Sequence, residues 1–197
     1  MKKILLFLAL TFQIFSLKAN NLVFKLSNDS LLNKKNVIIV EYQRLRSTHS
    51  TIFNGFNITY AKQVSEKGNL GIGIEYSYAP FHGDNGYNLY NLKFLPIYLG
   101  YRYDILTNRK LIPFLLGNIG YTFSGYDEEE DGKPQTRHRI KEGGLYLNGA
   151  FGAKYRISRT FVPIISLGFK GFHNTLNNLD VNPHGFVIRT GLLININ

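Results

Sequence analysis

The 197-residue sequence contains no cysteine. Without disulfides, an exported protein of this size must be stabilised by other means. The sequence also lacks, after its first residues, any run of about 20 apolar residues that could span a membrane as a helix. A membrane location for the mature chain therefore requires a β-barrel, because in lipid only helices and closed barrels satisfy every backbone hydrogen bond.

Residues 1–19 are predicted to be a secretory signal peptide. Lys2 and Lys3 form a charged start, residues 4–17 are mostly apolar, and Ala19 is a small residue suited to cleavage. The apolar stretch is short for a membrane helix. We therefore expect an exported protein, and we assign the mostly polar residues 20–36 to an N-terminal periplasmic arm.

The chain is basic, with a formal net charge of +10. Lys2, Lys3 and Lys18 of the signal contribute three of these charges, which leaves +7. Nucleic-acid binding would normally bring a basic helix or a recognisable module, and the sequence has neither. We expect partners among outer-membrane lipids and lipopolysaccharide, and no nucleic acid.

Apolar residues alternate with polar or small ones over most of the sequence, which is the period of a β-strand. The clearest case is residues 70–79 (LGIGIEYSYA), where aliphatic and aromatic side chains would occupy one face. A helix would scatter these faces. The pattern predicts strands at residues 37–46, 55–63, 69–80, 92–104, 111–126, 143–158, 161–173 and 185–197.

The connections between these strands alternate in length. They are short at residues 64–68, 105–110 and 159–160, and longer at 47–54, 81–91, 127–142 and 174–184. Transmembrane barrels have this asymmetry, with short periplasmic turns and longer external loops. The sequence therefore predicts an all-β protein, an eight-stranded antiparallel up-and-down transmembrane β-barrel over residues 37–197, in the bacterial outer membrane.

The soluble alternative is a lipocalin-like barrel or a β-sandwich, whose polar strand faces would meet water. The composition of those faces argues against it, because small residues suit a crowded, narrow interior. The faces carry Gly71, Gly73, Gly100, Gly120, Gly152, Gly168 and Gly191. Tyrosine and phenylalanine gather near strand ends, as in the aromatic girdles of membrane barrels.

Two stretches have patterns that are typical of a known class of membrane barrels. They are residues 112–121 (IPFLLGNIGY), with proline and an aromatic residue at the start of a strand, and residues 149–155 (GAFGAKY). On these patterns residues 37–197 resemble the small outer-membrane barrels of the OmpA/OmpX type, the outer membrane protein beta-barrel domain. Such barrels usually end in an aromatic residue that assists assembly. This chain departs from that pattern, since its last residues are Ile194, Asn195, Ile196 and Asn197.

The interior of an eight-stranded barrel is just wide enough for side chains to fill, so the sequence does not predict a porin. Several charged residues fall on the inward face, because charges are costly toward lipid. They are Glu41, Glu75, Arg102, Asp104, Lys154, Arg156, Lys170 and Arg189. We expect these charges to pair as a salt-bridge network, and the alternative is an ion path or gate.

The longest predicted external loop contains an acidic run at residues 127–131 (DEEED), followed by Lys133, Arg137, Arg139 and Lys141. We expect a solvated, mobile loop. Binding of divalent cations or of lipopolysaccharide phosphates is the alternative, because carboxylates ligate such cations and arginine binds phosphate.

The five histidines fall in or beside the predicted long loops and show no ligand-like spacing on a single element, so we expect no metal site and no cofactor. They are His49, His82, His138, His173 and His184. Isolated surface histidines are the commoner arrangement.

One segment resembles, loosely, that of outer-membrane lipid A deacylases, in which a histidine lies two residues before a catalytic serine and an Asn-Pro turn leads into the last strand. The resemblance implies that Thr175 is the nucleophile and His173 its base, with Asp180 as the nearby acid. Threonine replaces serine here, and turn-forming residues alone also explain the segment.

Two functions are therefore compatible with the sequence. The favoured one is a non-enzymatic barrel with a structural role or a surface-interaction role through its long external loops. The alternative is a lipid A-modifying hydrolase that uses His173 and Thr175. Fold alone does not separate them, because function resides in the site.

Overall fold

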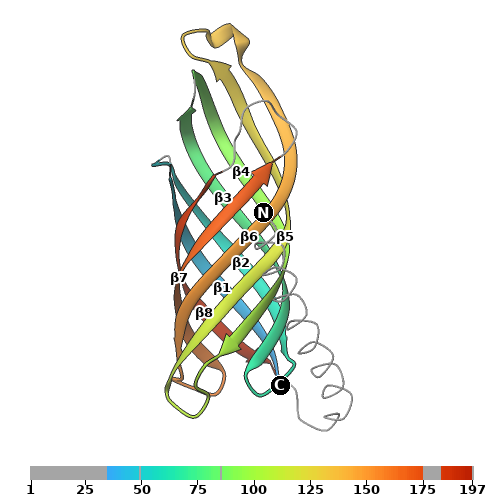
Figure 1. The fold of residues 1–197 in the computed structure, drawn as a ribbon, viewed down its shortest axis with the longest axis vertical. Helices are drawn as coiled ribbons and strands as arrows, with labels where there is room; N and C mark the ends of the chain where they lie inside the picture. Colours follow the sequence, from blue (N-terminus) through green and yellow to red (C-terminus); the bar gives the residue numbers. More distant parts are fainter. Residues whose placement is uncertain (1–34, 49, 85, 175–182, 197) are drawn as a thin grey trace, which may run out of the picture. The chain divides into compact units, whose positions relative to one another are not determined.

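The computed structural model describes residues 35–48, 50–84, 86–174 and 183–196. These residues form strands and one short 3-10 helix, η1 (Figure 1). The strands are β1 (Asn36–Ser47), β2 (Ile52–Gln63), β3 (Gly68–Asp84), β4 (Tyr87–Asp104), β5 (Leu111–Glu130), β6 (His138–Tyr155), β7 (Phe161–Asn174) and β8 (His184–Ile196), and η1 is Pro134–Thr136. The predicted signal peptide, the N-terminal arm up to residue 34 and the C-terminal Asn197 lie outside the described residues.

The eight strands of the described residues form one closed, antiparallel, up-and-down sheet, because β1 pairs with both β2 and β8. This confirms the predicted fold class. Asn36 pairs with Ile196, so β1 begins and β8 ends at the same end of the barrel. We call it the turn end, since the connections β2–β3, β4–β5 and β6–β7 also lie there, and we call the opposite end the loop end. No helix in the described part of the chain is long and apolar enough to cross a membrane.

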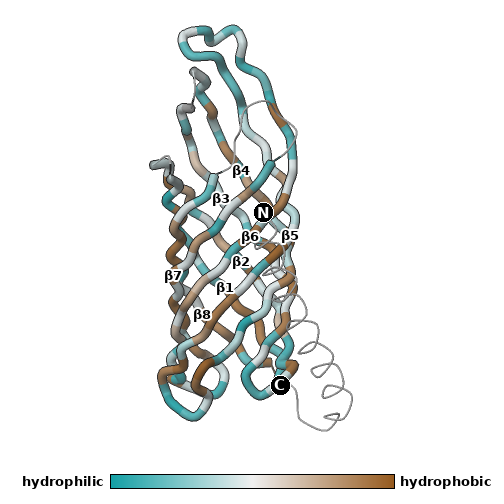
Figure 2. The backbone as a smooth tube through the Cα atoms, in the orientation of Figure 1, coloured by the Kyte–Doolittle hydropathy of each residue, from teal (hydrophilic) through white to brown (hydrophobic). Residues whose placement is uncertain are grey.

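The outer face of the barrel is apolar, as the alternation predicts. On β3, Leu70 and Ile72 are 50% and 54% exposed, while the residues on either side of Ile72 face inward. The same holds on every strand, and hydrophilic residues concentrate on the hairpins and turns at the two ends (Figure 2). A contiguous apolar surface of this extent is not stable in water, so it is a lipid-facing surface.

The interior is filled by side chains. One apolar cluster, which includes Leu45, Phe94 and Phe172, occupies the lumen on the loop side, and a second, which includes Val37, Phe114 and Leu193, lies on the turn side. Charged side chains separate the two clusters. The glycines predicted to face a crowded interior do so, because a side chain at most of them would meet atoms of a neighbouring strand.

The prediction was wrong about two of the external loops. Four strands continue past the barrel wall and pair only with one another, because β3 pairs with β2 no further than Tyr78 and β6 pairs with β7 only from Gly144. We call this extension the raised sheet: residues 79–84, 87–93, 125–130 and 138–143. The acidic run expected in a mobile loop lies mostly in β5, which ends at Glu130. Beyond the membrane both faces of a hairpin can be polar, so these strands leave no alternating pattern.

Candidate functional site in the barrel interior

Three charged side chains from three strands meet at the centre of the lumen. The Lys170 ammonium on β7 lies 2.8 Å from one carboxylate oxygen of Glu75 on β3, and the Arg189 guanidinium on β8 lies 3.5 Å from the other. All three are essentially inaccessible to solvent. We call these three residues the central ionic cluster. Pairing is what makes such buried charges tolerable, because each ion loses several kcal/mol of hydration.

Neutral side chains complete the cluster. Gln43 on β1 accepts hydrogen bonds through its Oε1 from Lys170 at 3.0 Å and from Arg189 at 3.3 Å. The Tyr146 hydroxyl on β6 donates to Glu75 at 2.9 Å, and the Ser77 hydroxyl donates to the same carboxylate at 2.8 Å. The network therefore connects five strands of the barrel through its interior: β1, β3, β6, β7 and β8.

These neutral partners were not predicted from the sequence. Gln43, Ser77 and Tyr146 occupy inward positions of the alternating pattern, so their direction could be foreseen. Their contacts could not, because the lumen brings together strands that are not neighbours in the sheet, and sequence alternation carries no information about contacts across it.

A second group of charges lies nearer the turn end. The Lys154 ammonium on β6 lies 2.6 Å from an Asp104 carboxylate oxygen on β4. Arg102 is buried beside them, attracted by both Asp104 and Glu41, and its guanidinium packs over the Phe114 ring at 5.5 Å from the centroid.

Glu41 lies between the two groups of charges. Its carboxylate attracts Arg102 on one side and Arg189 of the central ionic cluster on the other. Charges of opposite sign thus alternate along the lumen. Arg156 follows the end of β6 at Tyr155, and its exposed side chain lies at the turn end, close to Lys154.

Aromatic rings close the lumen on the loop side of the central ionic cluster. Phe94 and Phe172 stack with their centroids 4.7 Å apart. Phe53 contacts Phe94 edge-on at 5.6 Å, and Tyr146 contacts Phe172 at 5.5 Å. All four rings are buried. The described residues thus place a buried aromatic layer directly on an ion-paired layer, and side chains fill the lumen at this level.

The residues of the deacylase-like alternative are not brought together in the described part of the chain. His173 lies on the outward face of β7, paired with Leu145, and its side chain is exposed. Its neighbour Asn174 points inward and donates to Glu142 at 3.3 Å. Thr175 and Asp180 lie outside the described residues. The structure gives this alternative no support.

The histidines of the described residues are separate from one another. His82 hydrogen-bonds the Thr51 hydroxyl, His184 the Thr48 hydroxyl, and His138 the backbone carbonyl of Thr136. His49 lies outside the described residues. Within the described ranges no three histidines or carboxylates come close enough to hold a metal ion.

The raised sheet is held by polar contacts centred on Asp127 of β5. Its carboxylate lies 2.8 Å from the Arg139 guanidinium and 3.5 Å from that of Arg137, and it accepts a hydrogen bond from Asn91 at 3.1 Å. The hydrogen bonds from Arg139 and Asn91 hold the pKa of Asp127 below its ordinary value of 3.8. Arg137 also packs over the Tyr90 ring at 4.3 Å, which links β4 to the hairpin of β5 and β6.

A closed eight-stranded barrel with an apolar outer band and a filled lumen defines the class: a small transmembrane β-barrel. No family model matches the sequence, and no curated protein matches it significantly. Solved structures do match. Neisserial surface protein A (NspA) aligns with a TM-score of 0.58 at 11% identity, over 83% of this chain and 97% of that one.

Two further solved structures give the same result. A major outer membrane protein from Thermus thermophilus aligns with a TM-score of 0.59 at 10% identity, over 83% of this chain and 100% of that one. The outer membrane protein OprG from Pseudomonas aeruginosa aligns with a TM-score of 0.57 at 12% identity, over 82% of this chain and 95% of that one. The chain thus has the OmpA/OmpX-like fold of small outer-membrane barrels, which confirms the resemblance seen in the sequence.

Proposed function

We propose that this protein is a non-conducting integral barrel of the bacterial outer membrane whose working part is the raised sheet, displayed outside the cell for interaction with an extracellular partner. The single observation that carries the proposal is the contrast between the filled lumen and the raised sheet. The lumen is sealed by aromatic rings and the central ionic cluster, while β3 to β6 continue well past the barrel wall.

The orientation follows from the connections. Short turns face the periplasm and longer hairpins face outward in barrels of this kind, which supports an orientation with the raised sheet outside the cell. Export by a signal peptide at residues 1–19 is consistent with this orientation. The outer-membrane barrels of similar fold also support the location.

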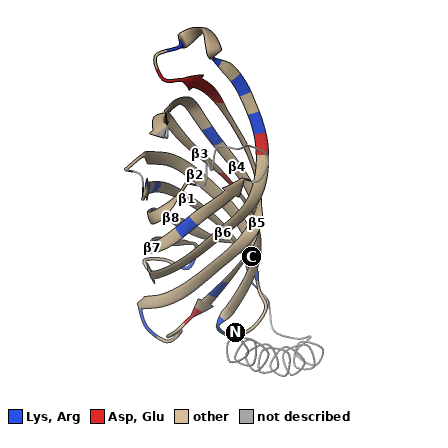
Figure 3. Cartoon of the chain, turned by 45° about the horizontal axis from the view of Figure 1, so that its top comes forward, with Lys and Arg blue, Asp and Glu red and all other residues tan. Residues whose placement is uncertain are grey.

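The raised sheet suits recognition because its strands are hydrogen-bonded to one another and it is highly charged. Its β5 strand carries Glu129 and Glu130, and its β6 strand carries Arg139 and Lys141 (Figure 3). Contacts of Asp127 fix the hairpin, so binding would cost less conformational entropy than binding by a mobile loop.

The location is tested by cold and boiled gel mobility of the protein recovered from outer-membrane fractions. A closed barrel resists unfolding in detergent, so we expect a band that shifts on heating. Recovery in the soluble periplasmic fraction without a shift would remove the membrane assignment.

The interaction is tested by a photo-cross-linking residue introduced on whole cells at Lys141, which is exposed in the raised sheet, and in a matched variant at Leu99, which is exposed in the apolar band. We expect macromolecular adducts from position 141 and only lipid adducts from position 99. Lipid adducts alone from both positions would contradict a role in surface interaction.

A further inference from the structure

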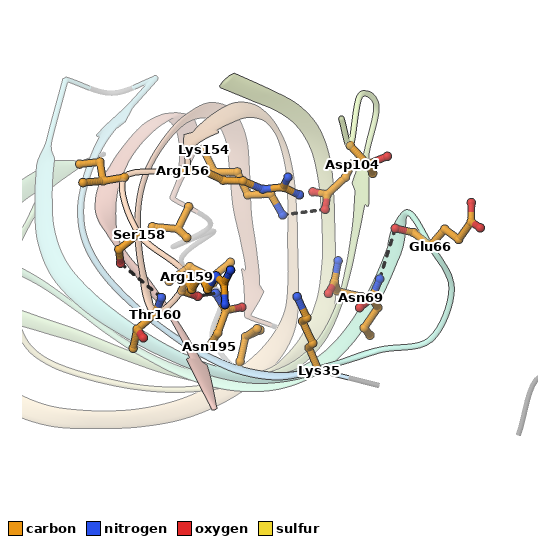
Figure 4. Close-up of a pocket in the computed structure, with 16 residues that line it drawn as sticks. Lys35, Glu66, Asn69, Asp104, Lys154, Arg156, Ser158, Arg159, Thr160 and Asn195 are labelled. Atoms are coloured by element: carbon orange, nitrogen blue, oxygen red, sulfur yellow. Dashed lines mark hydrogen bonds and ion pairs between the residues drawn. The ribbon is translucent and has the colours of Figure 1, made fainter. Parts of the chain in front are cut away.

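The turn end of the barrel contains a cavity of about 740 Å³ that opens on the barrel axis. Residues of seven strands, β1, β2, β3, β4, β6, β7 and β8, line it together with the turns. We call it the turn-end cavity. Its charged lining residues are Lys35, Glu66, Asp104, Lys154, Arg156 and Arg159 (Figure 4).

The two carboxylates of this lining neutralise only one of its cations, Lys154. Asp104 is already bound to Lys154 at 2.6 Å. The Glu66 side chain extends away from the cavity (Figure 4). Arg156 lies close enough to Lys154 to repel its charge, as does the buried Arg102. Positive charge therefore predominates at the walls.

Lys35, Arg156 and Arg159 have no carboxylate within 4 Å among the described residues. Figure 4 shows Lys35 and Arg159 extending into the cavity from different parts of its wall, with Arg156 beside Lys154. Together they place around one space three cations that no carboxylate of the described residues neutralises.

The turn that carries the two arginines is fixed by hydrogen bonds. The Ser158 hydroxyl accepts from the backbone N–H groups of Thr160 at 3.2 Å and Phe161 at 2.8 Å. The Asn195 side chain on β8 donates to the Arg159 carbonyl at 2.6 Å. These bonds fix the backbone that carries both arginines beside the cavity, which lowers the part of the entropic cost of binding that comes from ordering the turn.

The surrounding turns strengthen the positive potential. Lys67, Arg109 and Lys110 lie on them and Lys62 lies at the adjoining end of β2, while Glu66 is the one acid among the described residues 62–67, 105–110 and 156–160. A concave site lined by charges of one sign focuses the field and concentrates counter-ions.

We propose that the turn-end cavity binds a phosphate group, with Arg156, Arg159 and Lys35 as its ligands. Two guanidinium groups and an ammonium match the double negative charge and the several acceptor oxygens of a phosphate better than the single charge of a carboxylate. The site lies at the opposite end of the barrel from the raised sheet, so it does not depend on the surface-interaction role.

The test is calorimetric titration of the mature full chain, in non-ionic detergent at low ionic strength, with inorganic phosphate. We expect saturable binding that the double variant Arg156→Gln/Arg159→Gln weakens by about tenfold or more, since charge-assisted hydrogen bonds are lost. The matched control is Arg109→Gln/Lys110→Gln, which removes the same charge from the same end but outside the cavity lining. We expect the control to retain affinity within about threefold, because only screened, longer-range attraction is lost.

Both variants are checked for the heat-dependent gel shift, so that loss of the fold is not mistaken for loss of the site. Absence of saturable binding by the unaltered protein, or equal weakening by the two double variants, would overturn the proposal.

Two sources could supply the phosphate: a soluble phosphate compound, or the headgroup of an anionic phospholipid. Repeating the titration in bicelles of phosphatidylcholine, with and without phosphatidylglycerol, separates them. Displacement of inorganic phosphate by phosphatidylglycerol assigns the site to a lipid headgroup. Unchanged binding assigns it to a soluble phosphate.

Discussion

Lys170 and Glu75 stand 95 positions apart in the sequence and meet at 2.8 Å in the middle of the lumen. Their strands, β7 and β3, are not neighbours in the sheet, so the contact crosses the barrel. Arg189 adds a third strand to the same carboxylate at 3.5 Å. The walls of the barrel are thus connected through its interior as well as around its circumference.

Glu75→Gln is expected to destabilise the barrel strongly. The substitution leaves Lys170 and Arg189 buried together without a counter-charge, and breaking a buried ion pair in this way costs about 3–5 kcal/mol. The measurement is urea-induced unfolding in lipid vesicles. The matched control is Glu66→Gln, an exposed carboxylate at the turn end, for which we expect a change within about 0.5 kcal/mol.

The double variant Glu75→Gln/Lys170→Met is expected to be less destabilised than Glu75→Gln alone, because it removes one of the two uncompensated cations. If Glu75→Gln changed stability by no more than its exposed control, or if the two substitutions were simply additive, the central ionic cluster would not have the role described.

The outward-facing residues of the barrel could be predicted from the sequence, whereas the contacts inside its lumen could not. Alternation over residues 70–79 predicts which side chains face outward, because lipid and the crowded interior select different residues at successive positions. It could not predict that Glu75 meets Lys170, nor that Gln43 and Tyr146 complete the cluster, since such contacts depend on closure of the sheet.

At the loop end, the alternation of apolar and polar residues led to a wrong prediction for a different reason. Residues 127–130 continue β5 in the raised sheet. Because both faces of this strand segment are polar, the sequence predicts a loop there. What stabilises them is a set of specific contacts between Asp127, Asn91 and Arg139, which no periodicity reveals. Arg156 follows the last residue of β6 and lines the turn-end cavity, beyond the charges that are paired in the lumen.

Acid is expected to loosen the raised sheet. Its contacts lower the pKa of Asp127, so the stability that they confer is present above the ordinary value of 3.8 and is lost as the pH falls below it, through the lower pKa of the folded state. Because the sequence has no cysteine, Glu129→Cys gives a single spin-label site in the hairpin. Its mobility in electron paramagnetic resonance should rise as the pH is lowered through this range.

In the Asp127→Asn background the same label should be mobile at every pH, and a label at Leu99→Cys in the apolar band should show no pH dependence. An identical pH step with and without Asp127 would assign the effect to another group.

Gly73→Ala is expected to destabilise the barrel. Tyr98 lies directly opposite Gly73 on β4, and its ring covers the glycine so closely that an added Cβ would meet a ring carbon at 2.4 Å. The ring is buried and its hydroxyl is hydrogen-bonded to Thr59 at 2.7 Å, so it has little freedom to move. We expect a loss of about 1–3 kcal/mol in the unfolding free energy.

The matched control for this prediction is Gly117→Ala on the outward face of β5, where an added Cβ meets nothing within 4 Å. It should change the unfolding free energy by less than about 0.5 kcal/mol. Equal effects of the two substitutions would show that Tyr98 does not restrict position 73.

The outer tip of the β5–β6 hairpin in the raised sheet is expected to be dispensable for the barrel. Replacing residues 128–138 by an Asn-Gly turn joins Asp127 to Arg139, its partner in the register of β5 and β6, through a tight hairpin. The shortened variant should keep the heat-dependent gel shift, because the central ionic cluster and the aromatic layer are unchanged. It should also lose the cross-linked adducts formed outside the cell. Loss of the gel shift would mean that residues 128–138 support the barrel itself.

The claim that the lumen is sealed is tested most directly by electrical recording from the purified protein in a planar lipid bilayer. With the lumen closed by Phe94, Phe172 and the central ionic cluster, the account predicts no stepwise current in molar salt at any moderate voltage. Reproducible single-channel steps from heat-modifiable protein would contradict it, and would make the charged interior an ion path.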